Sequence, residues 1–123
     1  MTTRSFFEEL NAAFLINPFN HAEHVIGKAR VAMDQSVHSP DEVYMAFIKS
    51  LEQGCGAASS ALRTVTEMAD RHQVVVRLFV HPIRSAAAER KLTLTRDKLV
   101  SWYRRNGFEQ VSRGYMLRQP ASL

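Results

Sequence analysis

A glycine-rich turn has the residue types and spacing to bind a phosphate group, and it reads Gln53-Gly54-Cys55-Gly56-Ala57-Ala58. It lies between an extended apolar segment and an amphipathic helical segment. A turn that opens a helix leaves several backbone N–H groups unpaired and pointing one way, and the positive end of the helix dipole adds to them. Gly54 and Gly56 keep side chains out of the path of a ligand. The pattern predicts a phosphate or pyrophosphate site; the alternative is a tight connection between two elements.

The segments on either side of this turn predict a strand–helix–strand unit. Residues 42–49 alternate with apolar side chains on both faces, Met45 and Phe47 sharing one of them, which indicates an interior strand. Residues 58–72 carry an apolar stripe at helical spacing. Residues 74–80 form a nearly continuous β-branched and apolar run, typical of a buried parallel strand. Together these segments predict a βαβ unit with a right-handed crossover.

The remaining segments extend this unit into a mixed sheet. Apolar spacing predicts a helix over 4–16 and a half-buried strand over about 24–33. Thr95 is the predicted N-cap of a helix that stops at Gly107. The predicted hairpin strands are 109–112 and 115–118, and the predicted loops are 18–23, 35–40 and 82–93. The order α, β, β, α, β, α, β, β predicts one domain of mixed α/β class over residues 1–123.

Composition limits the classes of protein that this chain can belong to. A length of 123 residues fits one domain, and 46% hydrophobic residues without repeats is ordinary for a folded protein. No apolar stretch approaches membrane-spanning length, and the N-terminus lacks a signal-peptide pattern. The single cysteine suits the cytoplasm. A net charge of +4 suits an anionic ligand. The basic residues are scattered along the chain, however, so the sequence does not predict a nucleic-acid partner.

Two separated motifs resemble the GNAT (GCN5-related) N-acetyltransferase family. Residues 53–58 match that family's acetyl-CoA pyrophosphate loop, and the run from Trp102 to Phe108 resembles its late aromatic, Tyr and Gly-Phe signature. The helix and the apolar strand between them are in the family's order, so the resemblance covers residues 41–119 by pattern. The final Tyr115-Met116-Leu117-Arg118 is similar to the small GNAT-type proteins of phages. The resemblance implies a single-domain GNAT-like α/β fold, a mixed sheet flanked by helices and truncated on its N-terminal side.

The resemblance also implies a reaction: acetyl-CoA, as co-substrate, would give its acetyl group to an amine by direct attack in a ternary complex. Strand backbone groups would bond the pantetheine arm, at Ala46, Phe47 and Ile48. The cofactor-binding turn would comprise Gln53, Gly54, Cys55, Gly56, Ala57 and Ala58, with the hydroxyl of Ser59 added. Tyr103 falls where many members keep a tyrosine that protonates the departing thiolate, and its alternative is a core aromatic residue.

Glu42 is the candidate general base for removing a proton from the amine. It begins the strand that leads to the glycine turn, where some family members place a catalytic glutamate, and Asp41 is the second candidate. A solvated carboxylate at a strand end is the alternative interpretation. The family often keeps an asparagine that bonds pantetheine near the position of Arg96. The sequence therefore departs from the family pattern at that contact.

Other functions stay compatible with the sequence. One is a GNAT-fold module that binds a host or partner protein without catalysis, and another is a nucleobase-modifying relative. Cys55 has no histidine at a defined spacing, so a small filler is favoured over a nucleophile. His21 and His24 are three residues apart, so they could bind one metal ion if this segment were helical. No further Cys, His, Asp or Glu cluster completes such a site, so no metal is predicted. The sequence does not specify the amine acceptor. We expect a homodimer through the apolar C-terminal hairpin. We also expect a cytoplasmic location, which for a phage protein is the cytoplasm of the host.

Overall fold

The computed structural model describes residues 2–51, 56–80 and 95–121. Within them the chain forms α1 (Thr2–Ala13), β1 (Leu15–Asn17), β2 (Asn20–Ile26), β3 (Ala29–Gln35), β4 (Glu42–Ser50), α2 (Ala57–His72), β5 (Val75–Phe79), α3 (Arg96–Arg105), β6 (Glu109–Ser112) and β7 (Tyr115–Arg118). The strands make one sheet in the order β1-β2-β3-β4-β5-β7-β6. β4 and β5 are parallel, and the other neighbouring pairs are antiparallel. The predicted mixed α/β sheet is confirmed.

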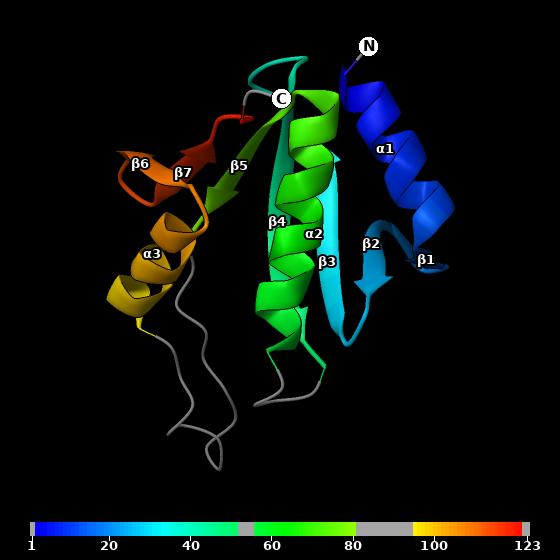
Figure 1. The fold of residues 1–123 in the computed structure, drawn as a ribbon, viewed down its shortest axis with the longest axis horizontal. Helices are drawn as coiled ribbons and strands as arrows, with labels where there is room; N and C mark the ends of the chain where they lie inside the picture. The colour runs from blue at the N-terminus through cyan, green and yellow to red at the C-terminus, as the bar shows by residue number, and fades with distance from the viewer. Residues whose placement is uncertain (1, 52–55, 81–94, 122–123) are drawn as a thin grey trace.

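The helix α2 packs along the middle of the sheet, with α1 beside it (Figure 1). Its buried side chains recur at helical spacing and are Ala57, Ala61, Leu62, Val65, Thr66, Met68 and Ala69. Beneath them the strands contribute Val31, Val43 and Val76, all without solvent exposure, and α1 adds Phe6 and Leu10. Burial of each large apolar side chain contributes about 1.5–3 kcal/mol. This layer therefore holds β4 and β5 in place, as the predicted stripe on α2 requires.

The single strand predicted over residues 24–33 is wrong. The structure has two strands there, β2 and β3, which are joined by a turn at Gly27 and Lys28. Gly27 adopts φ +60°, a left-handed conformation that favours glycine. Ile26 stands opposite Ala29 across the turn, and both side chains are buried. Because buried residues continue on both sides of the turn, the period-two pattern does not distinguish this hairpin from one long strand.

The N-terminal helix also ends earlier than predicted, at Ala13, and the next residues form the short strand β1. Asn17 accepts a hydrogen bond from the N–H of Phe19 at 2.9 Å, and Asn20 accepts one from the N–H of Ala22 at 3.2 Å. Such asparagine side chains stabilise tight turns. The chain therefore reverses at once and β1 pairs with β2, so that part of the predicted loop at 18–23 is strand.

The strand β4 contains a bulge that the sequence pattern did not reveal. The register with β3 shifts by one residue, so Ala46 has no partner in β3. An extra residue displaces the alternation of side chains by one position. Ile48 therefore follows Met45 into the core and is 8% exposed, whereas Phe47 is 38% exposed. The prediction that Met45 and Phe47 share a face is wrong for this reason.

The C-terminal elements agree closely with the prediction. Thr95 caps α3 by accepting a hydrogen bond from the N–H of Lys98 at 3.3 Å. Gly107 ends the helical segment with φ +91°, and the hairpin of β6 and β7 turns at Arg113 and Gly114. These features depend on signals within a few residues of each other, which is why they were predictable. The loop predicted at 82–93 lies outside the described residues.

Asp70 joins the C-terminal end of α2 to β7. Its carboxylate accepts two hydrogen bonds from the guanidinium of Arg118, at 2.7 and 3.0 Å, and one from the N–H of Ala121, at 2.8 Å. The Asp70 and Arg118 side chains are only 16% and 13% exposed. The hydrogen bonds from Arg118 outweigh the effect of burial and hold the pKa of Asp70 below its usual value.

Replacing Asp70 by asparagine should lower the free energy of unfolding by about 2–4 kcal/mol at neutral pH, because Arg118 would keep a mostly buried charge without its partner. The pKa of Asp70 is depressed on folding, so this stabilisation is present above the unfolded pKa of about 3.9 and is lost as the pH falls through the folded-state pKa. Urea denaturation at neutral and acidic pH measures both effects. Glu67→Gln, exposed on the same helix, is the control, with an expected change below about 0.5 kcal/mol. Equal losses in the two variants would contradict this importance of the ion pair.

Candidate functional site

The strands β4 and β5 pair only along the first part of β4. Their parallel ladder ends where Met45 stands opposite Leu78, whereas β4 continues to Ser50. Just beyond β5, Val80 donates its N–H to the carbonyl of Gly114 at 2.7 Å, so the end of β5 follows β7. The two strands therefore diverge after Met45, as Figure 1 shows.

The bulge at Ala46 accounts for this divergence. An extra residue bends its strand and increases the local twist, and this one stands directly after the last parallel pair. Over residues 47–50, β4 pairs with β3 on one side, and no described strand pairs with its other side. Backbone groups that face such a side bond an extended ligand in the way an added strand would.

The three residues predicted to line a pantetheine arm, Ala46, Phe47 and Ile48, lie at this divergence. Their side chains have different surroundings, since Ala46 is half-buried, Phe47 is exposed and Ile48 is buried. The feature that they share is a backbone that leaves β5. This arrangement suits the predicted main-chain contacts better than contacts through side chains.

The first turn of α2 presents backbone donors. Gly56 precedes it with φ +70°, and its carbonyl accepts the N–H of Ser60 at 3.0 Å. No side chain caps this end among the described residues, so the N–H groups of Ala57, Ala58 and Ser59 have no acceptor within the helix. A Cβ atom added to Gly56 would meet no atom within 4 Å in the described part of the chain. The predicted residues Gln53, Gly54 and Cys55 lie outside the described residues.

A hydrogen bond that the sequence did not predict joins α3 to this turn. The indole N–H of Trp102 donates to the hydroxyl of Ser59 at 3.1 Å. The Ser59 hydroxyl accepts this bond and keeps its own proton for a further acceptor. The two residues are far apart in sequence, so no local pattern could have paired them. The bond positions the aromatic residues of α3 beside the N-terminus of α2.

Tyr103, the predicted proton donor, lies on the buried face of α3 and is 8% exposed. Its ring packs against Phe108, with centroids 5.5 Å apart, and against Trp102, with centroids 4.9 Å apart. No described residue forms a hydrogen bond with its hydroxyl. Burial raises the pKa of Tyr103 to about 12, so the phenol keeps its proton at neutral pH. Its position serves the core.

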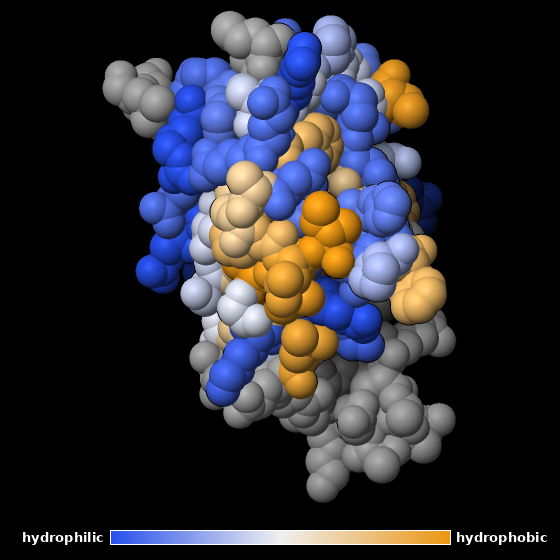
Figure 2. All heavy atoms as spheres, turned by 90° about the vertical axis from the view of Figure 1, so that its right-hand side faces the viewer, coloured by the Kyte–Doolittle hydropathy of each residue, from blue (hydrophilic) through white to orange (hydrophobic). Residues whose placement is uncertain are grey.

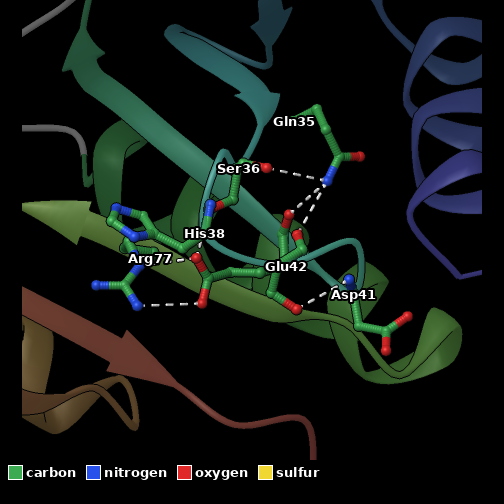
Figure 3. A network of polar contacts seen from close by, with 7 residues as sticks. Gln35, Ser36, His38, Asp41, Glu42 and Arg77 are labelled. Atoms are coloured by element: carbon green, nitrogen blue, oxygen red, sulfur yellow. Dashed lines mark hydrogen bonds and ion pairs between the residues drawn. The ribbon is translucent and has the colours of Figure 1, made fainter.

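Glu42, the predicted base, is held in a polar network at the start of β4 (Figure 3). The guanidinium of Arg77 donates to both carboxylate oxygens, at 2.7 and 3.3 Å, and the hydroxyl of Ser36 donates to one of them. Burial favours a higher pKa, but the bonds from Arg77 and Ser36 outweigh it and lower the pKa of Glu42. Glu42 also lies four residues, about 13 Å of extended strand, before the bulge at Ala46. The structure therefore brings Glu42 to Arg77, and not to the divergence of the strands.

The turn between β3 and β4 is part of the same network. The side-chain amide of Gln35 donates to the carbonyls of Ser36, Ser39 and Glu42, at 3.4, 3.2 and 3.1 Å (Figure 3). Asp41, the second candidate base, is exposed in this turn, and its N–H donates to the Ser39 hydroxyl at 3.3 Å. The network fixes this turn, which the sequence predicted only as a loop over residues 35–40.

Aromatic residues that the sequence analysis did not select gather on the sheet face opposite α2, at the end of the parallel ladder. Tyr44 in β4 stands opposite Arg77 in β5, one pair before the parallel ladder ends. Next to them, Phe79 in β5 stands opposite Tyr115 in β7. The Arg77 guanidinium lies 5.9 Å from the centroid of the Tyr115 ring, and the Phe79 and Tyr115 rings meet edge to face at 4.9 Å. Burial and the neighbouring Tyr115 raise the pKa of Tyr44. These side chains border the point where β4 and β5 separate.

The described residues show neither a metal site nor a membrane-spanning helix. No group of three or more His, Cys, Asp or Glu side chains among them is arranged to hold a metal ion. His21 and His24 lie in β2, where His24 is buried and bonds Asn11 at 2.8 Å, while His21 is exposed. In the same ranges, no helix combines the length and the apolar character that crossing a bilayer demands.

Glu42→Gln should lower the free energy of unfolding by about 3 kcal/mol at neutral pH, because Arg77 would lose the charge of its partner in a largely buried place. The pKa of Glu42 is depressed on folding, so this stabilisation is present above the unfolded value of about 4.3 and is lost in acid as the pH falls through the folded pKa. Denaturant titrations measure the loss, and Asp34→Asn on exposed β3 surface is the control. The double variant Glu42→Gln/Arg77→Met should recover part of the loss. If the loss in the double variant equals the sum of the losses in Glu42→Gln and Arg77→Met alone, the pairing is not what stabilises this end of the sheet.

Comparisons with known proteins bear on the fold. No protein-family model matches this sequence, and no curated protein is similar to it. The crystal structure of the anti-CRISPR protein AcrVA5 superposes with a TM-score of 0.58 at 17% sequence identity, over 77% of this chain and 94% of that one. The NatC complex bound to a Gag peptide and CoA contains a chain that superposes with a TM-score of 0.55 at 10% identity, over 98% of this chain and 91% of that one. Likenesses at these identities show the architecture alone: this chain has a GNAT-like fold.

Proposed function

We propose that this protein binds acetyl-CoA and transfers its acetyl group to an amine by direct attack in a ternary complex. The observation that carries the proposal is the pairing of two features at one end of the sheet. β4 leaves β5 at the Ala46 bulge, and the chain then leads to the uncapped first turn of α2. An extended arm that ends in a diphosphate has the chemistry to use both. CoA is also the ligand of the NatC complex, one of the structures that this fold resembles.

The residues present fit such a ligand. The N–H groups at the start of α2 favour negative charge, because they lack acceptors among the described residues and lie at the positive end of the helix dipole. No atom of the described residues lies within 4 Å of a Cβ added to Gly56, which would let a phosphate approach the backbone. Along residues 46–48 no described strand pairs with the side of β4 away from β3, and backbone groups that point to that side suit the amides of a pantetheine arm. The thioester would then lie where the two strands separate.

In this proposal Tyr103 assists the departure of sulfur. As the amine nitrogen bonds to the carbonyl carbon and the C–S bond breaks, the Tyr103 hydroxyl gives its proton to the sulfur and receives the proton that the amine loses. The pKa of Tyr103 is about 12, well above the usual thiol value of about 8.5, so the tyrosinate cannot persist. The two proton transfers must therefore be coupled. The products are an amide and free CoA thiol.

Acetyl-CoA should raise the midpoint of thermal unfolding, because a ligand that binds only the folded state adds about 2.7 kcal/mol at a concentration of 100 Kd. Gly56→Asp should weaken binding at least about tenfold, measured by isothermal titration calorimetry, because its carboxylate would face the diphosphate at the helix start. Aspartate tolerates positive φ better than most residues, so folding is preserved.

Gly27→Asp is the matched control for this experiment. Gly27 has a similar φ of +60° and equally open surroundings, but it lies in the β2–β3 turn, on the far side of β4 from β5. Its affinity for acetyl-CoA should stay within about twofold of the wild type. Equal losses in both variants, or no binding by the wild type, would remove the basis of the proposal.

Tyr103→Phe should reduce turnover by about a hundredfold while leaving the affinity for acetyl-CoA and the thermal stability nearly unchanged, because the ring and its packing are kept. The release of thiol from acetyl-CoA is measured with poly-L-lysine, a peptide with a free N-terminus and spermidine as amines. Unchanged turnover would assign Tyr103 to the core alone. Tight binding without turnover on any amine would favour a binding module over an enzyme.

A further inference from the structure

We propose that a second copy of this chain docks on the β1 edge of the sheet. β1 is the end strand of the described sheet and pairs only with β2 within it. End strands direct part of their backbone N–H and C=O groups outward, where they accept another strand. This surface is separate from the divergence of β4 and β5, so the inference is independent of the proposed activity.

The side chains of this edge are apolar and exposed. Leu15 is 76% exposed, Ile16 39% and Phe19 96%. Figure 2 shows hydrophobic side chains gathered across the middle of the molecular face that lies on the right in Figure 1, where α1, β1 and β2 lie, with hydrophilic side chains around them. We call Leu15, Ile16 and Phe19 the edge patch. A patch of this kind, rimmed by polar residues, is typical of a protein–protein contact.

Charge argues for a second copy as the occupant of the edge patch. The patch lies in the longest segment of the chain without Asp, Glu, Lys or Arg, which spans residues 10–22. Two identical chains with a net charge of +4 repel each other, so a contact between copies is favoured where neither contributes a charge. The opposite edge differs, because β6 includes Glu109 and its turn includes Arg113. Charged residues of this kind protect an edge strand from pairing.

The exposed area is also of the size that a dimer uses. A fully exposed side chain of this size presents roughly 150–200 Å², so the edge patch exposes about 400 Å² on each copy. Two copies would together bury about 800 Å² of apolar surface, which is half of a standard interface of about 1,600 Å². The polar rim would supply the rest. Antiparallel pairing of β1 with its copy across a two-fold axis continues the sheet and sets Leu15 and Ile16, which lie on opposite faces of it, beside the same residues of the partner.

Light scattering coupled to size-exclusion chromatography tests the proposal, with the wild type at about 100 μM. We expect a mass twice that of the 14.0 kDa chain. Because the patch is uncharged, the dimer should persist when salt is raised from about 0.1 to 1 M, whereas a contact made by surface charges would weaken. A wild-type monomer at this concentration, or a dimer that salt dissociates, would overturn the proposal.

Matched variants locate the contact. Leu15→Asp and Phe19→Asp should each yield monomers, while Val37→Asp and Val111→Asp, which replace apolar side chains that are 96% and 51% exposed elsewhere, should stay dimeric. All four positions are exposed, and circular dichroism verifies that each variant is folded. Val111 lies in β6, so a monomeric Val111→Asp beside a dimeric Phe19→Asp would assign the contact to the C-terminal hairpin and reject the β1 edge.

Discussion

The extra residue at Ala46 separates β4 from β5, and the rest of the molecule is arranged around that separation. Parallel strands normally bond along their whole shared length, but here the ladder stops at Met45 opposite Leu78. The bulge bends β4 away, and the hydrogen bond from Val80 to Gly114 draws the end of β5 toward β7. Backbone groups that a regular sheet would consume are left beside the start of α2. A candidate site made of main-chain groups places few demands on side chains.

The other end of the same strand pair is closed. Arg77 and Ser36 bond the Glu42 carboxylate, Gln35 fixes the adjoining turn, and Asp70 with Arg118 holds the end of α2 against β7. The polar anchors thus gather at one end of the sheet and the diverging backbone at the other. A closed end resists separation of the strands, so the bulge can open one end without loosening the whole sheet.

The sequence predicted those parts of the fold that depend on near neighbours. The buried stripe of α2, the Thr95 cap and the hairpin at Arg113 and Gly114 each follow from residues within one or two turns of chain. The hairpin at Gly27 was missed because alternation looks the same on both sides of a tight turn. The bulge was missed because it is defined by the register with β3, and the Trp102–Ser59 bond because it joins two helices. For the candidate site, the motif resemblance selected β4, which diverges from β5, and the start of α2, whereas the surroundings of Glu42 depend on Arg77 in a neighbouring strand.

In the proposed reaction, the ion pair of Glu42 has a consequence for the acceptor amine. A carboxylate that is bonded by Arg77 and Ser36, with a lowered pKa, is a weak base, and it lies four residues before the bulge. An ammonium must then lose its first proton to water before the attack, or the amine must arrive neutral; the proton that would pass to Tyr103 is the one lost after the nitrogen has bonded to the carbonyl carbon. At pH 7 about one in ten N-terminal α-amines is neutral, compared with about one in 2,500 lysine side chains. The pKa of the acceptor would therefore affect the rate more than it does at a site with a strong base.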